Sequence, residues 1–292
     1  MSYVLHILIM INIYIILSVS TNLLVGLANL LSLGQAAFYG IGAYVAAFAL
    51  LGLGWPLLPS LIACMVVTAL FSFLLSYVSI RLDGDYFILA TLGFQIIVFT
   101  LLYNWIDLTK GPYGIPGIPA PKLLGQWEIG GINGFVVLSS VLSLITVGVF
   151  YRLIYSPFGR ALKGMRDDEI GMLALGKNIT ALKKEAFVVS SAFVAISGFL
   201  YASYISYIDP TSFNLDEAIF ILTAVLIGGS GNIKGPVVGA VFVILLPEIL
   251  RFVGLPDSVA ANLRMIIYGL VLIVLMRFRP QGLAGEYQFV KG

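Results

Sequence analysis

Charged residues are scarce in this sequence. Asp, Glu, Lys and Arg make up 10% of its 292 residues, whereas about 25% of a soluble globular domain is charged. Hydrophobic residues reach 60%, and the mean hydropathy is +1.04. A chain of this composition cannot cover its apolar surface in water. The sequence therefore predicts an all-α polytopic membrane protein with one domain over residues 1–292, and the net charge of +2 is too small to indicate a nucleic-acid partner.

Cysteine and histidine are nearly absent as well. Cys64 is the one cysteine, so an intramolecular disulfide is excluded, and we interpret it as a small buried hydrophobe. His6 is the one histidine, and a single Cys with a single His argues against a structural metal site. The glycine-rich stretch GGSGNIKGP (228–236) lacks the Lys-Ser/Thr pair of a phosphate-binding loop. We therefore expect no catalytic residue, no metal site and no ATP hydrolysis by this chain.

Long apolar runs predict the membrane-spanning helices, because one crossing needs about 20 mostly apolar residues. The first run, 3–30, begins without the basic residues or cleavage site of a signal peptide, so we interpret it as a retained span. It is long for one crossing and polar near Ser18–Asn22, so it forms either one span or a helix followed by a half-helix. The expected count is about nine spans, within a range of eight to ten. The runs are 3–30, 33–52, 57–80, 86–104, 132–154, 185–207, 218–230, 235–253 and 262–278.

Basic residues predict the orientation, because loops rich in Lys and Arg stay in the cytoplasm. The region 156–184 carries six of them, and the tail 279–292 is basic too, so both are expected in the cytoplasm. The Pro- and Gly-rich loop 105–131 is poor in basic residues and is expected outside. Long loops of this composition are often functional. With nine spans the N-terminus lies outside, and with ten it lies inside.

Residues 156–185 hold ten of the thirty charged residues. Ser156 followed by Pro157 is typical of a helix start, Gly176 is typical of a helix end, and Thr180 is a candidate cap for the next helix. Two interpretations remain for the first helix. It lies on lipid headgroups, or it docks on a cytoplasmic partner, which its mixture of charge signs favours. Its expected apolar face consists of Leu162, Met165, Met172 and Leu173.

Two glycine-rich breaks precede glycine-spaced helices, at 29–44 and 226–240. Broken helices at matching positions of two halves are typical of a transport pathway. The same glycines also fit close helix packing, so a repeat is one of two interpretations. The glycines assigned to breaks or packing are Gly34, Gly40, Gly228, Gly229, Gly231, Gly235 and Gly239.

Ionisable residues inside a span are functional candidates, and the expected spans hold almost none. Asp209, Asp216 and Glu217 fall beside an expected outside loop, and Glu248 lies near a helix end. This scarcity argues against an ion-coupled carrier. Neutral polar residues form either hydrogen bonds between helices or the lining of a pathway. The pathway candidates are Asn29, Ser32, Gln35, Thr91 and Gln95.

Six segments, taken in order, carry a resemblance to a known family. Over nearly its whole length the sequence resembles the membrane permeases of branched-chain amino acid ABC importers, the LivH/LivM family, and more closely the LivM type. The segments are LSLGQAAFYGIGAY (31–44), GDYFILATLGF (84–94), TKGPYGIPGI (109–118), SPFGRALKGMRDDE (156–169), AVLIGGSGNIKGPVVGA (224–240) and FRPQGLAG (278–285).

The resemblance implies a non-catalytic permease subunit of a bacterial or archaeal cytoplasmic membrane that works by alternating access. It implies that ATP and Mg²⁺ bind to two partner ATPase subunits. A second, LivH-like permease and an extracytoplasmic binding protein would complete the importer, with membrane lipid around it. The helix after Ser156 would be the coupling helix, although Gly171-Met172 stands where the family has small Ala residues. The residues assigned to ATPase coupling are Gly159, Arg160, Lys163, Arg166, Asp167, Asp168, Glu169 and Gly176.

The resemblance favours Leu, Ile or Val as substrate and leaves other amino acids, amides, urea and small carboxylates open. Two functions of other classes compete with it. A stand-alone carrier or channel would work without an ATPase and would usually need an ion-binding charge in the membrane. An intramembrane enzyme would need clustered acids, His or Cys, and the spans show no such cluster.

Overall fold

The computed structural model describes residues 2–82, 84–123 and 127–252, together with 263, 266, 267, 269, 270, 273, 277 and 282–284. Six described helices are long and apolar enough to cross a membrane, which confirms an all-α polytopic membrane protein. The expected span 262–278 and most of the tail 279–292 lie outside the described elements. The six are α1 (Ser2–Asn22, continued by a π-helical turn Leu23–Leu27), α2 (Gln35–Ala47, continued by a π-helical turn Phe48–Gly52), α3 (Leu57–Ser79), α4 (Asp85–Asn104), α6 (Gly131–Tyr155) and α9 (Ile179–Ile205).

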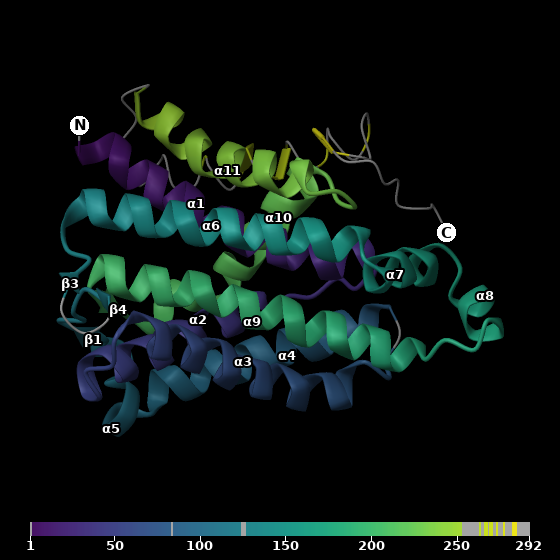
Figure 1. Ribbon diagram of the computed structural model, residues 1–292, viewed down its shortest axis with the longest axis horizontal. Helices are drawn as coiled ribbons and strands as arrows, with labels where there is room; N and C mark the ends of the chain where they lie inside the picture. The colour runs from purple at the N-terminus through teal and green to yellow at the C-terminus, as the bar shows by residue number, and fades with distance from the viewer. Residues whose placement is uncertain are drawn as a thin grey trace.

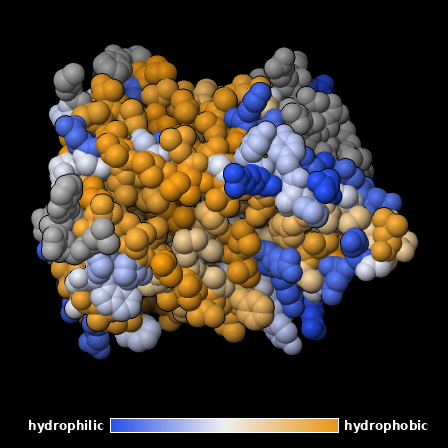
Figure 2. Space-filling view, in the orientation of Figure 1, coloured by the Kyte–Doolittle hydropathy of each residue, from blue (hydrophilic) through white to orange (hydrophobic). Residues whose placement is uncertain are grey.

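The helices run nearly side by side along the long axis of the molecule (Figure 1). Helix α2 packs against α9 and α3, and α1 packs against α6, α9 and α11 (Lys234–Phe252). Helices α2 and α9 are mostly buried, whereas α3 and α4 expose most of their apolar side chains. Figure 2 shows an apolar band across the middle, with hydrophilic residues gathered at the ends. An exposed apolar band is stable in lipid and not in water, so α3 and α4 form a lipid-facing surface.

The first expected run forms one uninterrupted helix from Ser2 to Leu27. At about 1.5 Å per residue its 26 residues span the bilayer once, so the alternative of a helix followed by a half-helix is wrong. The polar residues near its end are buried without breaking it. Ser18 Oγ donates to the carbonyl of Tyr14 at 2.7 Å, and Thr21 Oγ1 donates to that of Leu17 at 2.8 Å.

Small elements close the two ends of the bundle. At one end, which we call the loop end, lie α5 (Ile106–Thr109), a 3-10 helix (Gly111–Tyr113), β1 (Ile115–Pro116), β2 (Lys122–Leu123), β3 (Trp127–Glu128) and β4 (Tyr207–Ile208). Strand β1 pairs antiparallel with β4, and β2 with β3. At the other end, the charged end, lie α7 (Pro157–Asp167) and α8 (Glu169–Ala174) (Figure 1). A 3-10 helix (Pro210–Phe213) and α10 (Leu215–Gly228) complete the described elements.

Two segments without α-helix enter the bundle before an α-helix, and the second contains the 3-10 helix Pro210–Phe213. Residues 28–34 follow α1 at the charged end and lead into α2. Residues 206–214 follow α9 at the loop end and lead into α10. Helix α10 has 14 residues, so it is about 21 Å long and cannot cross a hydrocarbon core of about 30 Å alone. Segment 28–34 enters from the charged end and segment 206–214 from the loop end, so the two enter from opposite ends of the bundle.

The structure favours close helix packing, one of the two interpretations of the glycine-rich stretch 226–240, because residues 229–233 form the tight turn between α10 and α11. A Cβ on Gly235 would lie 1.8 Å from the carbonyl oxygen of Gly229, and one on Gly239 would lie 1.9 Å from that of Ala224. Gly228 faces Gly235 at similarly close range, and Gly229 and Gly231 turn the chain at φ +100° and +96°. These glycines permit close packing of two antiparallel helices.

Candidate coupling and translocation sites

Helix α7 begins at the cap expected from the sequence. Ser156 Oγ accepts a hydrogen bond from the backbone N–H of Gly159 at 3.2 Å, and Pro157 occupies the first helical position. Gly159 is buried against the end of α6, where a Cβ would lie 2.3 Å from the carbonyl oxygen of Leu153. Helix α7 is therefore fixed closely to the end of α6.

The expectation of one helix from Ser156 to Gly176 is wrong, because the chain bends at Asp168. Asp168 is extended, with φ −153°, and its Oδ1 accepts from the backbone N–H of Gly171 at 2.9 Å, which caps α8. Leu162 and Met165 are buried as expected, but Leu173 is 55% exposed. Gly176 ends the region at φ +74°. The cap of α9 is Asn178, not Thr180, since Asn178 Oδ1 accepts from the N–H of Ala181 at 3.0 Å.

The charged side chains of the coupling candidates face in different directions. Arg166 turns inward: its side chain is 10% exposed, and its Nη1 donates to the backbone carbonyl of Gly26 at 2.8 Å. Its Nε pairs with Asp167, which is 59% exposed, at 2.9 Å. Glu169 pairs with Lys183 of α9 at 2.9 Å. At the start of α7 both cations meet Tyr155: Arg160 Nη1 donates to its carbonyl at 2.8 Å, and Lys163 Nζ lies 5.7 Å from its ring centroid.

The end of α1 joins the coupling region to the α10–α11 turn. Asn22 Oδ1 accepts from the N–H of Gly231 at 3.2 Å, and Asn22 Nδ2 donates to the carbonyl of Asn232 at 2.8 Å. Asn232 Nδ2 in turn donates to the carbonyl of Ala284 at 2.6 Å. One turn of α1 therefore holds α7 through the Gly26 carbonyl and the α10–α11 turn through Asn22.

Four of the five pathway candidates are buried, and two of them, Thr91 and Gln95, bind segments 28–34 and 206–214 to α4. Thr91 Oγ1 accepts from the N–H of Leu33 at 3.2 Å, which ties segment 28–34 to α4. One helical turn later, Gln95 Nε2 donates to the carbonyl of Phe213 at 2.7 Å, which ties segment 206–214 to the same helix. Phe213 also packs over Gly40. Helix α4 is thus the element that touches both segments.

The remaining candidates divide into two groups. The Oγ of Ser32 is used locally, accepting from the N–H of Gly34 at 3.2 Å. Gln35 is 1% exposed, and within the described part of the chain neither atom of its side-chain amide has a hydrogen-bond partner. Asn29 is exposed, with φ 53°, at the turn after α1. The structure therefore does not bring Asn29 together with the other four.

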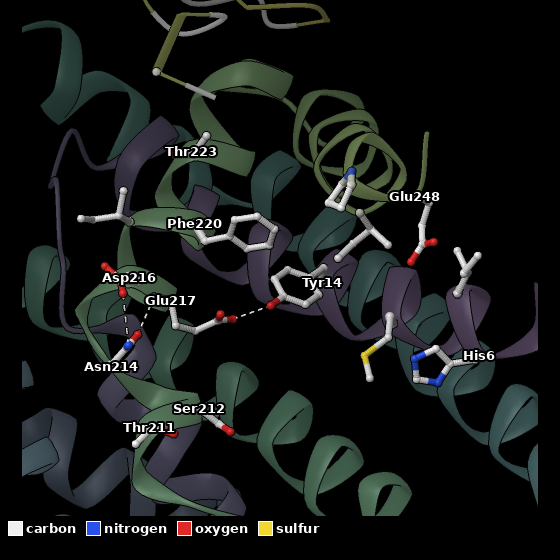
Figure 3. Close-up of a pocket in the computed structure, with 16 residues that line it drawn as sticks. His6, Tyr14, Thr211, Ser212, Asn214, Asp216, Glu217, Phe220, Thr223 and Glu248 are labelled. Carbon is white, nitrogen blue, oxygen red and sulfur yellow. Dashed lines mark hydrogen bonds between the residues drawn. The ribbon is translucent and has the colours of Figure 1, made fainter. Parts of the chain in front are cut away.

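The sequence placed Glu217 beside an outside loop, and it indeed follows segment 206–214, but it also belongs to the first turn of α10. There its Oε1 accepts from the hydroxyl of Tyr14 at 2.6 Å (Figure 3). Tyr14 lies midway along α1, so this carboxylate is at the depth of the membrane interior. The Asn-x-x-Glu spacing from Asn214 to Glu217 was the available signal, because it is a helix-start pattern. Asn214 Oδ1 indeed accepts from the N–H of Glu217 at 3.1 Å.

Glu217 lies at a cavity of about 610 Å³ among the described residues, which we call the α1–α10–α11 cavity. His6 and Glu248 lie at its other side (Figure 3). Glu248 accepts a hydrogen bond from the hydroxyl of Tyr3, and His6 Nδ1 lies 2.7 Å from the hydroxyl of Tyr204. Spanning helices, interrupted by segments without α-helix and flanked by a cavity with acidic residues, are typical of a membrane transport protein.

Comparisons with known proteins give the family. Residues 3–276 match the model of the family described as branched-chain amino acid transport system / permease component. The chain is 36% identical over 298 aligned positions to the high-affinity branched-chain amino acid transport system permease protein LivM of Salmonella typhimurium, covering 93% of this chain and 67% of that protein. It is 28% identical over 243 positions to a probable LivM of Methanocaldococcus jannaschii, covering 77% of this chain and 68% of that protein.

A more distant similarity reaches the ribose import permease protein RbsC of Haemophilus influenzae, with 27% identity over half of this chain. No solved structure matches the chain. The chain belongs to the family of branched-chain amino acid permease components, and it is a multi-pass permease subunit of an ABC importer in the cytoplasmic membrane.

Proposed function

We propose that this permease moves branched-chain amino acids, Leu, Ile or Val, into the cell by alternating access. The observation that carries the proposal is 36% identity to a branched-chain amino acid permease over 93% of this chain. Other amino acids, amides, urea and small carboxylates are the substrates that compete with this proposal. The chain supplies no ATP chemistry, so ATP and Mg²⁺ are bound by two separate ATPase subunits.

The proposed assembly contains a second, LivH-like permease and an extracytoplasmic binding protein. The charged end of the bundle faces the cytoplasm, and the loop end, with the 105–131 loop, faces the binding protein. The basic residues of 156–184 support this orientation. In this arrangement α10 together with segment 206–214, then α11 and the run 262–278, add three crossings to the six spans, for about nine, with the N-terminus outside.

The proposed docking surface for an ATPase subunit lies at the bend between α7 and α8. Three large apolar side chains of this region are exposed: Ile170 at 79%, Leu173 at 55% and Leu175 at 75%. Asp167, Asp168 and Glu169 are exposed beside them. An apolar patch with charged groups at its rim fits a groove on a protein partner, where the patch becomes the buried centre.

The movement of the docked ATPase reaches the pathway through rigid contacts. Gly159 couples α7 to α6, and Arg166 couples it to the Gly26 carbonyl of α1. Asn22 continues this connection to the α10–α11 turn. These contacts would transmit a displacement of α7 to α6, α1 and the α10–α11 turn, because packed helices shift as units. In the proposal Arg166 is therefore a positioning residue, while Arg160, Lys163, Asp167, Asp168 and Glu169 face the partner.

One part of the pathway is proposed to run beside α4, where segments 28–34 and 206–214 end. Gln35, Thr91 and Gln95 offer neutral hydrogen bonds that a moving substrate exchanges easily, and Gln35 has both amide atoms unused among the described residues. Asn29 and Ser32 lie at the entrance of the 28–34 segment.

Affinity purification of the chain from its native membrane, with mass spectrometry of the co-purifying proteins, tests the proposed assembly. The expected result is a second permease of similar composition together with two copies of a P-loop ATPase. Recovery of the chain alone, in detergents that preserve a known ABC importer prepared in parallel, would contradict it and favour an autonomous carrier.

A further inference from the structure

The α1–α10–α11 cavity has the size and the mixed lining of a small-molecule site (Figure 3). Its volume of about 610 Å³ lies within the range of about 300–1,000 Å³ that such sites occupy. Apolar and polar residues both line it. The apolar ones are Ile7, Met10, Ile219, Phe220, Ile244 and Pro247, and the polar ones include Tyr14, Ser212, Asn214 and Glu217.

The charge of the cavity is one-sided. Asp216, Glu217 and Glu248 line it, and the described lining residues include no Lys and no Arg. Glu248 is bonded to Tyr3, and Asp216 accepts from Asn214 Nδ2 at 3.3 Å. Asp216 is exposed, and His6 is the one described lining residue that can carry a positive charge. Glu217 lies deeper, beside Tyr14, where a carboxylate is costly unless a cation approaches it. The cavity therefore favours a ligand that carries a positive charge.

Glu217 is placed to meet such a ligand. It stands at the start of α10, where the chain turns from segment 206–214 into a helix inside the bundle. The Tyr14 hydroxyl donates a hydrogen bond to Glu217 Oε1 at 2.6 Å, and among the described residues Glu217 Oε2 has no hydrogen-bond partner. Tyr14 itself is held edge-on by Phe220, with 5.3 Å between ring centroids. The carboxylate is thus oriented by one bond and retains one oxygen for a donor.

The apolar wall gives the second half of the recognition. Phe220 is one turn of α10 after Glu217, so it lies on the same side of the helix. Met10 of α1 and Ile244 of α11 line the same space from the other two helices. A ligand that places its ammonium group at Glu217 would therefore place a short side chain against these apolar residues.

We propose that this cavity binds the transported amino acid during transit, with its α-ammonium group on Glu217 and its aliphatic side chain against Phe220 and Ile244. The inference rests on the proposed function for the identity of the ligand, and it adds a site, a charge preference and named residues to it. A lipid with a primary amine in its headgroup offers the same ammonium chemistry, so the test must separate the two sources.

The test uses the assembled importer, both permeases with the ATPase subunits and without the binding protein. The complex is placed in nanodiscs of phosphatidylcholine and phosphatidylglycerol, which lack a primary amine. Saturation-transfer NMR then compares three probes: L-leucine, 3-methylbutylamine, which lacks the carboxylate, and 4-methylpentanoate, which lacks the ammonium group. We expect transfer to L-leucine and to the amine, and none to the acid.

The decisive variant is Glu217→Gln, which keeps the shape of the side chain and an oxygen for the Tyr14 hydroxyl. We expect L-leucine binding to weaken by about tenfold or more, as when one member of a desolvated charge pair is removed. Asp85→Asn is the matched control, because it removes an exposed carboxylate from the first turn of α4, far from the cavity, and should bind L-leucine as the unaltered complex does. Tyr14→Phe keeps the carboxylate and should retain binding.

Equal binding of L-leucine by the unaltered complex and the Glu217→Gln complex would overturn the inference, provided that both hydrolyse ATP. Binding of the acid as strong as that of L-leucine would overturn it too, as would a complete lack of transfer to L-leucine. If phosphatidylethanolamine added to the nanodiscs abolishes L-leucine binding, the site belongs to the lipid and the inference is wrong. None of these results bears on co-purification of the partners or on uptake, which decide the proposed function separately.

Discussion

Arg166 in α7 donates a hydrogen bond from Nη1 to the backbone carbonyl of Gly26, which lies 140 positions earlier in the chain, at 2.8 Å. The carbonyl belongs to the π-helical turn at the end of α1. Carbonyls at a helix end have no intrahelical partner, so a cation there satisfies one and also complements the helix dipole. The contact therefore holds the coupling region on the same helix that contributes Tyr14 to the cavity.

Replacing Arg166 by Met should uncouple the importer. Uptake per ATP hydrolysed is expected to fall by about tenfold, equivalent to about 1.4 kcal/mol of coupling free energy, while ATP hydrolysis continues. Lys at this position restores the charge without the planar guanidinium and should recover part of the loss. Uptake and hydrolysis are measured together in proteoliposomes. Arg152→Met, an exposed position on α6, serves as control, and equal uptake in both variants would refute the positioning role of Arg166.

Replacing Gly26 by Ala should destabilise the junction between α1 and the α10–α11 turn. The added Cβ would lie 2.3 Å from Asn22 Oδ1 and 2.4 Å from the Gly231 nitrogen. Overpacking of this kind costs about 1–3 kcal/mol. Thermal unfolding of the purified chain in detergent should show a lower midpoint than for Gly148→Ala, where nothing lies within 4 Å of the added atom. Equal unfolding midpoints for the two variants would mean that the α10–α11 turn accommodates the added Cβ without strain.

Gln35 and Gln95 should respond in opposite ways to replacement by Leu. Gln35→Leu removes an amide without partners in the described structure, so stability should stay equal or rise while uptake falls. Gln95→Leu leaves the Phe213 carbonyl without its donor, which costs about 1–3 kcal/mol. Unfolding midpoints and uptake rates are compared for the two variants. Unchanged uptake in Gln35→Leu, with the substrate affinity of the binding protein intact, would return Gln35 to a packing role.

Replacing Leu173 by Ser should weaken the hold on the ATPase subunits, because Leu173 is exposed on the proposed docking surface. Removal of one apolar side chain from an interface centre commonly costs about 1–3 kcal/mol of binding. The yield of ATPase that co-purifies with the chain should therefore fall. Leu108→Ser removes a similarly exposed Leu at the loop end and should leave that yield unchanged. An equal loss in both variants would assign the effect to general destabilisation.

Local signals in the sequence predicted the spans and the start of α7 well. The runs 57–80, 86–104 and 132–154 match α3, α4 and α6 to within one residue at each end, because Gly, Pro or charged residues flank each apolar run. The Ser156 cap was predicted for the same reason, since capping depends on neighbours in the chain.

Those local signals could not predict contacts between residues that lie far apart in the sequence. The bend at Asp168 shortened the expected coupling helix, because an Asp can cap a new helix as readily as it continues an old one. Glu217 was left one residue before the expected span 218–230, because an apolar-run criterion trims a charged first turn from a helix. The bonds from Arg166 to Gly26 and from Gln95 to Phe213 join residues more than 100 positions apart, and no local pattern encodes such pairs.

Uptake of radiolabelled L-leucine into proteoliposomes tests the central claim most directly. The liposomes contain this chain with its co-purified partners, and the binding protein is supplied outside with ATP and Mg²⁺ inside. We expect L-leucine to accumulate against its gradient, to require both ATP and the binding protein, and to be competed by Ile and Val. Uptake that proceeds without ATP, or that follows an ion gradient instead, would contradict it.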